Sequence, residues 1–173
     1  MHLAYITVSG RGRIDALIAE VVEAFEKDGA RLAGTVRDRP IDPLGHPCDM
    51  DLRVLPDGPS FRISQPLGSG AKGCRLDGGV IETIAAAVEA RIPGADLLIV
   101  NKFGRQEAQG RGLCPAISLA MEMRIPTLVG VNEMNTSDFH AFSDGVAEPL
   151  PPDPRAVRAW YEKVQAPWAL AAV

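Results

Sequence analysis

The sequence predicts a three-layer α/β domain, in which helices cover both faces of a mainly parallel β-sheet. Residues 3–36 pass from an apolar strand through a helix-like segment to a second strand, which is the pattern of a right-handed βαβ unit. The apolar run 97–100 ends abruptly at Asn101. A buried parallel strand has this appearance where it delivers a loop to the carboxyl edge of its sheet.

The first βαβ unit begins with a strand over residues 3–8 and a tight glycine loop over 9–13. The spacing of apolar residues predicts a helix over 14–27, because these residues recur on one helical face. Gly29 is a typical helix stop, and residues 31–36 form the next expected strand.

The middle of the chain predicts an inserted β-hairpin. Pro56-Asp57-Gly58-Pro59 is a strong turn signal between candidate strands at 50–55 and 60–64. Asp77 then caps a predicted helix over 78–91, and the central strand occupies 96–101. The remaining expected elements are a helix at 113–124, a strand at 127–131, a short helix at 137–142 and a terminal helix at 153–164.

Composition narrows the class of protein. A length of 173 residues suggests a single domain over 1–173, and 46% hydrophobic content without a long apolar run suggests no membrane span or signal peptide. The net charge of −4 is unlike that of nucleic-acid-binding domains, and three cysteines do not suggest a disulfide framework. We therefore expect a cytoplasmic protein whose partners include neither nucleic acid nor a membrane.

The loop at 9–13 stands where a phosphate-binding loop would stand, between the first strand and the first helix. The full phosphate-binding pattern has a lysine and a Ser or Thr after its last glycine, whereas here Arg13, Ile14 and Asp15 follow Gly12. An ordinary tight turn with solvated arginines is the alternative. The candidate anion-binding residues of this loop are Gly10, Arg11, Gly12 and Arg13.

A second glycine-rich loop, Gly68 to Gly73, matches the pattern G-x-G-x-x-G. It follows a hairpin strand, so a dinucleotide site is not expected. Its backbone amides, with Lys72, Gly73 and Arg75, could hold an anion. A flexible connector is the competing interpretation.

The third cationic loop covers residues 101–112. Glu107 is the candidate catalytic base if the protein is an enzyme, although it could equally pair with a nearby arginine. The candidate anion-binding residues here are Asn101, Lys102, Gly104 and Arg111.

Metal binding has weaker support. Asp49 and Asp51 share one side of a strand and are candidate Mg²⁺ ligands, although they could simply be solvated. A zinc set would have to combine residues that lack paired ligand spacing, so buried cysteines are the preferred interpretation. The residues of that set are His46, Cys48, Cys74 and Cys114.

Four ordered motifs carry a family resemblance. They are Cys48-Asp49-Met50-Asp51-Leu52, Arg62-Ile63-Ser64-Gln65, Gly73-Cys74-Arg75-Leu76-Asp77 and Val100-Asn101-Lys102-Phe103-Gly104-x-x-Glu107-x-x-Gly110-Arg111-Gly112. The chain resembles an uncharacterised bacterial family of unknown function, encoded near molybdate-transport and molybdenum-enzyme genes. That family resembles divergent P-loop nucleoside triphosphatases.

The resemblance implies a degenerate P-loop fold and a site at the carboxyl edge of the sheet. In a similar archaeal–bacterial nucleoside-triphosphatase group the corresponding strand ends in Asp-Glu-x-Gly-x-x-Glu. Asn101, Lys102, Gly104 and Glu107 fall on this pattern, so both leading carboxylates are absent. The gene neighbourhood of the family implies a role in molybdenum or tungsten handling.

Three functions remain open at this level. The leading hypothesis is a non-hydrolytic protein that binds a small oxyanion, either molybdate, tungstate or a phosphate-like anion. The first alternative is a nucleoside triphosphatase with an atypical P-loop, in which Glu107 positions water and Asp49 or Asp51 recruits Mg²⁺. The second is an interaction protein on the same scaffold without a ligand. A homodimer is compatible with each.

Overall fold

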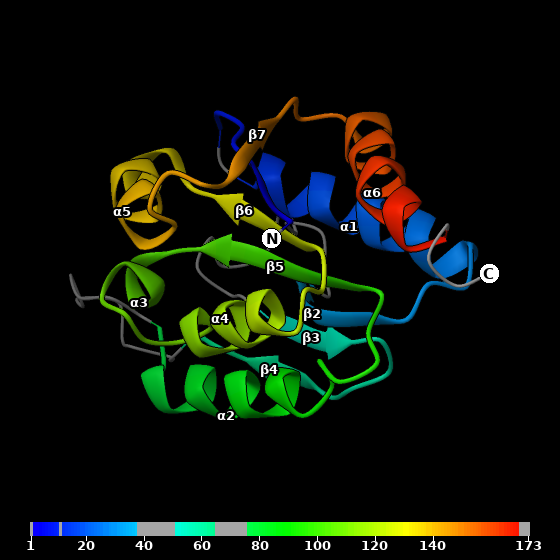
Figure 1. Ribbon diagram of the computed structural model, residues 1–173. Coiled ribbons are helices and arrows are strands. Elements are labelled where there is room, and N and C mark those ends of the chain that lie inside the picture. Colours follow the sequence, from blue (N-terminus) through cyan, green and yellow to red (C-terminus); the bar gives the residue numbers. More distant parts are fainter. Residues whose placement is uncertain (1, 11, 38–50, 65–75, 170–173) are drawn as a thin grey trace.

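The computed structural model describes residues 2–10, 12–37, 51–64 and 76–169 (Figure 1). Within them, seven strands form one sheet in the order β4-β3-β2-β5-β6-β1-β7. The neighbouring strands β2, β5, β6, β1 and β7 pair in parallel. Strands β3 and β4 add an antiparallel hairpin beside β2. The strands are β1 (Leu3–Ile6), β2 (Leu32–Arg37), β3 (Asp51–Leu55), β4 (Ser60–Arg62), β5 (Leu97–Phe103), β6 (Thr127–Val131) and β7 (Glu148–Leu150).

Helices cover both faces of this sheet and enclose two hydrophobic cores. One core lies between the sheet and α1 and α6, and the other lies between the opposite face and α2 and α4, which run side by side (Figure 1). No helix in the described part of the chain has the length and apolarity needed to cross a membrane. The helices are α1 (Arg13–Lys27), α2 (Gly78–Glu89), α3 (Arg105–Ala108), α4 (Cys114–Glu122), α5 (Thr136–Phe142) and α6 (Pro154–Ala169), with a 3₁₀ turn η1 (Glu133–Asn135).

Strand β5 is the centre of the sheet, and both of its neighbours approach it through glycine. A Cβ on Gly34 of β2 would lie 1.8 Å from the carbonyl oxygen of Ile99, and a Cβ on Gly130 of β6 would lie 2.3 Å from that of Asn101. Because real Cβ atoms do not come this close to backbone, only glycine fits at either position. These contacts hold β5 between β2 and β6.

The predicted fold class is confirmed, and so are the inserted hairpin and the helix cap at Asp77. The Asp77 carboxylate accepts hydrogen bonds from the backbone N–H groups of Gly79 and Val80. The prediction for β5 was too short, because the strand continues to the buried Phe103, which pairs with Val131 beyond a bulge. Asn101 and Lys102 therefore lie within the strand and not in the following loop.

Three short elements were absent from the prediction: α3, η1 and β7. None is long enough to show a periodic apolar pattern. Pro149 also argues against a strand at β7, but Pro is tolerated in an edge strand, and β7 pairs only with β1 at the edge of the described sheet.

We predict that Gly34→Ala lowers the free energy of unfolding by about 3 kcal/mol or more, since the new methyl group must displace β5 and the backbone φ of +124° is unfavourable for alanine. Urea unfolding followed by circular dichroism measures this loss. Gly29→Ala is the matched control, because Gly29 also has a positive φ of +76° but no atom within 4 Å of its Cβ position. Equal losses in the two variants would contradict the close approach at Gly34.

Candidate functional site

The loop between β1 and α1 contains two glycines in left-handed conformations. Gly10 has a φ of 103° and Gly12 a φ of 73°, and Gly12 is the N-cap residue of α1 without a side chain to cap it. The Arg13 guanidinium reaches back to the carbonyl oxygen of Ser9 at 3.4 Å, and the Ser9 hydroxyl donates to Glu133 of η1. The N-terminus of α1 therefore lies at the carboxyl edge of the sheet without a side-chain cap among the described residues.

A buried carboxylate in the first turn of α1 connects this loop to the centre of the sheet. Asp15 Oδ1 accepts a hydrogen bond from Asn101 Nδ2 at 2.9 Å and lies 3.0 Å from Lys102 Nζ, and Asp15 Oδ2 accepts a hydrogen bond from Arg37 at 2.9 Å. The three donors come from the carboxyl ends of β2 and β5. We call Asp15, Arg37, Asn101 and Lys102 the Asp15 cluster.

The Asp15 cluster stabilises the charged form of its carboxylate. Burial alone would raise the pKa of Asp15, but the charge of Lys102 and the hydrogen bonds from Asn101, Lys102 and Arg37 outweigh it and hold the pKa below the ordinary value of 3.8. The carboxylate therefore stays ionised at neutral pH and balances one of the two cations. The cluster keeps a net positive charge at the edge of the sheet.

Glu107 is also buried, but its environment differs. Its two oxygens accept hydrogen bonds from the backbone N–H groups of Gly104 at 2.9 Å and Leu113 at 3.1 Å. Burial raises the pKa of Glu107 in spite of these bonds, and the neighbouring Glu82 adds to the effect. The carboxylate holds the start of α3 and the turn that leads into α4 in place.

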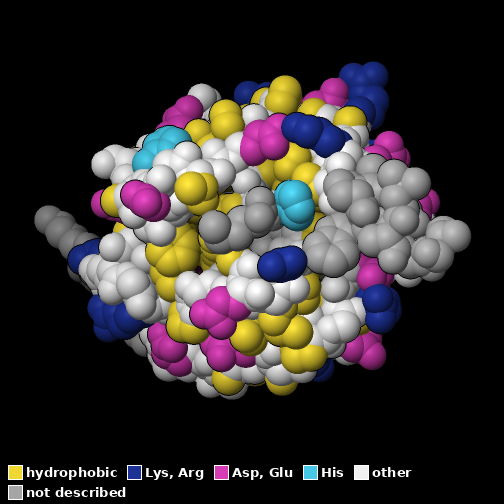
Figure 2. All heavy atoms as spheres, viewed as in Figure 1, with side chains coloured by type: hydrophobic (Ala, Val, Ile, Leu, Met, Phe, Trp, Pro, Cys, Tyr) yellow, Lys and Arg dark blue, Asp and Glu magenta, His cyan; other side chains and the backbone are white. Residues whose placement is uncertain are grey.

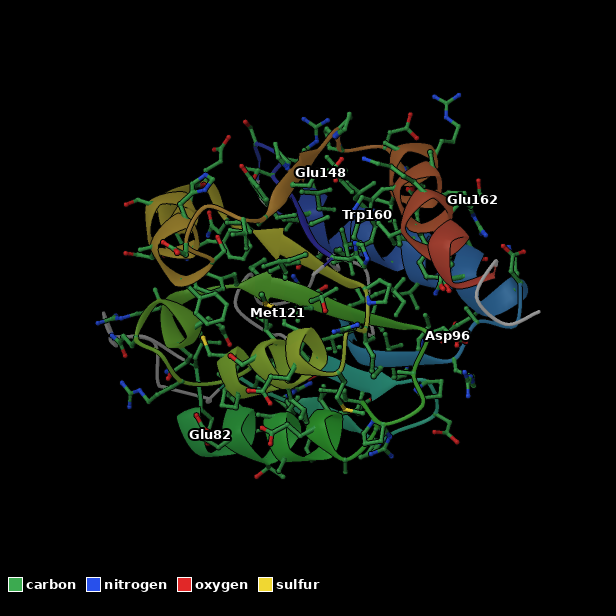
Figure 3. All side chains as sticks on the ribbon, in the orientation of Figure 1. Glu82, Asp96, Met121, Glu148, Trp160 and Glu162 are labelled. Atoms are coloured by element: carbon green, nitrogen blue, oxygen red, sulfur yellow. The ribbon has the colours of Figure 1, made fainter. Side chains whose placement is uncertain are left out.

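Glu82 supports the same turn from α2. Its carboxylate accepts a hydrogen bond from the backbone N–H of Gly112 at 3.0 Å. Figure 3 shows Glu82 near the start of α2 at the edge of the sheet where α3 lies, whereas Asp96 lies at the opposite edge, where β5 begins. The carboxylates of Glu82 and Glu107 thus both lie on the α3 side of the site.

A pocket of about 100 Å³ lies between these groups. Its polar lining comes from the Asp15 cluster, Thr35 and the α3 segment that includes Arg105 and Glu107. The apolar lining comes from residues in or beside the hairpin and α2, and from the residue before α4. These residues are Leu52, Ile63, Leu76, Ile81, Ile84 and Leu113. The pocket therefore has an apolar wall opposite a cationic one.

One acceptor in the pocket wall, Asn101 Oδ1, receives no hydrogen bond from the described residues. Asn101 is only 4% exposed, and its Oδ1 has no hydrogen-bond partner within the described residues. Its Nδ2 donates to Asp15, and its backbone N–H donates to Thr35 Oγ1 at 3.3 Å. A buried acceptor without a donor costs roughly 1–3 kcal/mol, so this atom marks a position that the fold alone does not satisfy.

The structure brings together only part of the sequence-predicted site. Asn101, Lys102, Gly104 and Glu107 line the pocket, and Gly10, Gly12 and Arg13 lie around the start of α1. Arg111 is exposed and donates to Gln109. The candidates Arg11, Lys72, Gly73, Arg75 and Asp49, and with them His46, Cys48 and Cys74, lie outside the described residues.

The remaining metal and cysteine candidates have local explanations. Asp51 forms an ion pair with Arg62 across the hairpin, with 3.1 Å between the carboxylate and Nε. Within the described ranges no group of three or more His, Cys, Asp or Glu side chains is placed to hold a metal ion. Cys114 is buried, and burial raises the pKa of its thiol to about 12, which keeps it protonated and unreactive.

Sequence reasoning did not include Arg37, Thr35 or Asp15 among the site residues. Asp15 was noted only as one of the residues that follow Gly12 in place of the lysine and the Ser or Thr of the full phosphate-binding pattern, because its partners are distant in the chain. Arg37 is separated from it by 22 residues and Asn101 by 86. The available signal was the position of Arg37 directly after the apolar strand Leu32–Val36, at the same sheet edge as Asn101.

Comparison with known proteins shows the family of this chain and a solved structure with a similar fold. The model of the family described as "Protein of unknown function (DUF2478)" matches residues 3–160, and the chain belongs to this family. Its fold resembles the solution structure of a human cancer-related nucleoside triphosphatase, with a TM-score of 0.52 and 14% identity over 86% of this chain and 87% of that one. The chain therefore shares its fold with that nucleoside triphosphatase.

A curated relative is similar in sequence. The chain is 33% identical over 161 residues to the molybdenum import ATP-binding protein ModC 2 of Bradyrhizobium diazoefficiens. The match covers 92% of this chain but 18% of the relative, so the chain spans less than a fifth of that protein's length.

We predict that Asp15→Asn lowers the free energy of unfolding by about 3 kcal/mol at pH 7, because it removes a buried carboxylate that forms ion pairs with both Arg37 and Lys102. Since the folded-state pKa of Asp15 is depressed, its stabilising effect is present above the ordinary value of 3.8 and is lost as the pH falls through the lower folded-state pKa. Urea unfolding from pH 7 down to pH 3 tests both expectations.

The control for this experiment is Asp153→Asn, which removes an exposed carboxylate paired with Arg155. We expect this variant to remain close to the wild type at pH 7. A constant difference between wild type and Asp15→Asn across the whole pH range would contradict the role assigned to the buried charge.

Proposed function

We propose that this chain is a nucleotide-binding domain of the P-loop type, which holds nucleoside phosphates at the carboxyl edge of its sheet. The observation that carries the proposal is the open start of α1, where Gly10 and Gly12 take left-handed conformations directly after β1. Backbone N–H groups and the positive end of the helix dipole favour an anion at such a position. Arg13 adds a cation beside it.

The similar proteins support a nucleotide as the ligand. The relative from Bradyrhizobium is named an ATP-binding protein, and the solved structure with the same fold is named a nucleoside triphosphatase. The charge distribution is compatible with this ligand. Among the coloured side chains of the face in Figure 2, those of Lys and Arg are interspersed with those of Asp and Glu.

We expect hydrolysis to be slow. Asn101 occupies the strand end where the similar triphosphatase group has carboxylates, and its Nδ2 donates to Asp15. A neutral amide held in this way is a poor anchor for Mg²⁺. Glu107 has the raised pKa that suits a general base, but both of its oxygens accept backbone hydrogen bonds.

Calorimetry with Mg-ATP and Mg-GTP tests the binding site. We predict saturable binding by the wild type and a loss of affinity of about tenfold or more in Gly12→Asp, because a new carboxylate would repel the phosphates. Gly29→Asp is the matched control, since Gly29 has a φ of 76° against 73° for Gly12 but lies at the far end of α1. No saturable heat with either nucleotide, or equal loss in both variants, would refute the proposal.

A second candidate function is the binding of molybdate or tungstate. Arg37, Asn101 and Lys102 already converge on one oxyanion, the carboxylate of Asp15, and the Bradyrhizobium relative is named a molybdenum import protein. In this case an inorganic oxyanion would replace or join the carboxylate among the same donors.

Titration with molybdate, tungstate, sulfate and phosphate separates the two functions. We predict that none of these anions binds more tightly than Mg-ATP, since the Asp15 carboxylate already occupies the converging donors. Tight binding of molybdate or tungstate without any response to ATP would replace the nucleotide proposal with the second candidate. Lys102→Ala removes one of the converging cations in this titration. Its control is Lys27→Ala, because Lys27 is exposed and pairs with Glu23 on α1.

A further inference from the structure

The orientation of the Asn101 amide is determined by Asp15. An ionised carboxylate can only accept hydrogen bonds, so the amide must present Nδ2 to Asp15, at 2.9 Å. Oδ1 is therefore the atom that remains buried without a donor in the described structure. A ligand that satisfies it must bring an N–H or O–H group into the pocket.

The apolar lining of the pocket favours a ligand with an apolar part. Ile81 and Ile84 of α2 and Leu113 before α4 line the pocket and are each at most 8% exposed. A volume of about 100 Å³ is several times what one water molecule needs. Water would satisfy Asn101 but not the apolar wall, whereas a small ring satisfies both.

The charges of the pocket restrict the ligand further. Its charged lining consists of three cations, Arg37, Lys102 and Arg105, and two carboxylates, Asp15 and Glu107, so the cations are in excess. An ammonium donor would be repelled, and a hydroxyl would bring lone pairs that also need donors. The N–H of an aromatic ring is a neutral donor without an acceptor lone pair, so it matches the single free Oδ1.

The pocket adjoins the glycine loop. Asp15, in the first turn of α1, lines the pocket, and Gly12 is the N-cap residue of the same helix. Neither Gly10 nor Gly12 lines the pocket, so the site of the ring lies next to the loop.

We propose that this pocket is a second ligand site, for a compact aromatic acid whose ring carries an N–H donor. The ring packs against Ile81 and Ile84, the ring N–H donates to Asn101 Oδ1, and the anionic group lies at Lys102 and Arg105. This site does not depend on the nucleotide-binding function proposed for the glycine loop.

The probe for the experiment is indole-3-acetate, with 1-methylindole-3-acetate as the matched compound that lacks the ring donor. Binding is followed by the methyl NMR signals of the isoleucines. We expect saturable shifts at Ile81 and Ile84, and an affinity at least about tenfold lower for the methylated compound, which corresponds to roughly 1.4 kcal/mol. Absence of shifts, or equal affinity for both compounds, would overturn the proposal.

Two variants locate the probe. Asn101→Leu should remove the difference between the two compounds, whereas Ile81→Phe should fill the pocket and abolish binding of both. Leu119→Phe is the control, because Leu119 packs against the same hydrophobic core but does not line the pocket. If Ile81→Phe retains a native spectrum and full affinity, the assigned site is wrong.

Addition of Mg-ATP distinguishes this proposal from the preceding one. Simultaneous binding of ATP and indole-3-acetate supports two separate sites, and mutual exclusion overturns the separation. Binding of indole-3-acetate without any binding of ATP supports the pocket and refutes only the nucleotide proposal.

Discussion

The buried carboxylate of Asp15 is the interaction on which the carboxyl edge of this protein depends. It joins the first turn of α1 to the ends of β2 and β5 through Arg37, Asn101 and Lys102. Because two cations and one amide converge on a single carboxylate, removing its charge would weaken several contacts at once. The same contact orients Asn101 and thereby leaves its Oδ1 without a donor among the described residues.

The site also depends on how closely the central strands approach one another. Gly34 and Gly130 allow β2 and β6 to lie directly against the backbone of β5. This spacing brings Arg37 to the same edge as Asn101 and Lys102, within reach of α1. Glu107 and Glu82 then hold the connection from α3 to α4 through backbone hydrogen bonds, which completes the far wall of the pocket.

Glu107 illustrates the limit of reasoning from residue type. A carboxylate among glycines and arginines suggests a catalytic base or an ion pair, but here it accepts hydrogen bonds from the backbone of Gly104 and Leu113. Backbone partners leave no signature in a sequence. Asn101 shows the opposite case, because its unusual place at the end of an apolar strand correctly indicated a position at the sheet edge.

The sequence by itself determined the α/β class, the hairpin and most helices, because these follow from local periodicity, turn residues and helix caps, and it indicated the edge of the sheet at which the candidate site lies. Only the tertiary structure decided which side chains meet there. Asp15, Arg37 and Asn101 are far apart in the chain, and their contact depends on strand order and on the close approach of glycine backbones. Long-range contacts of this kind are set by packing, which local sequence patterns do not encode.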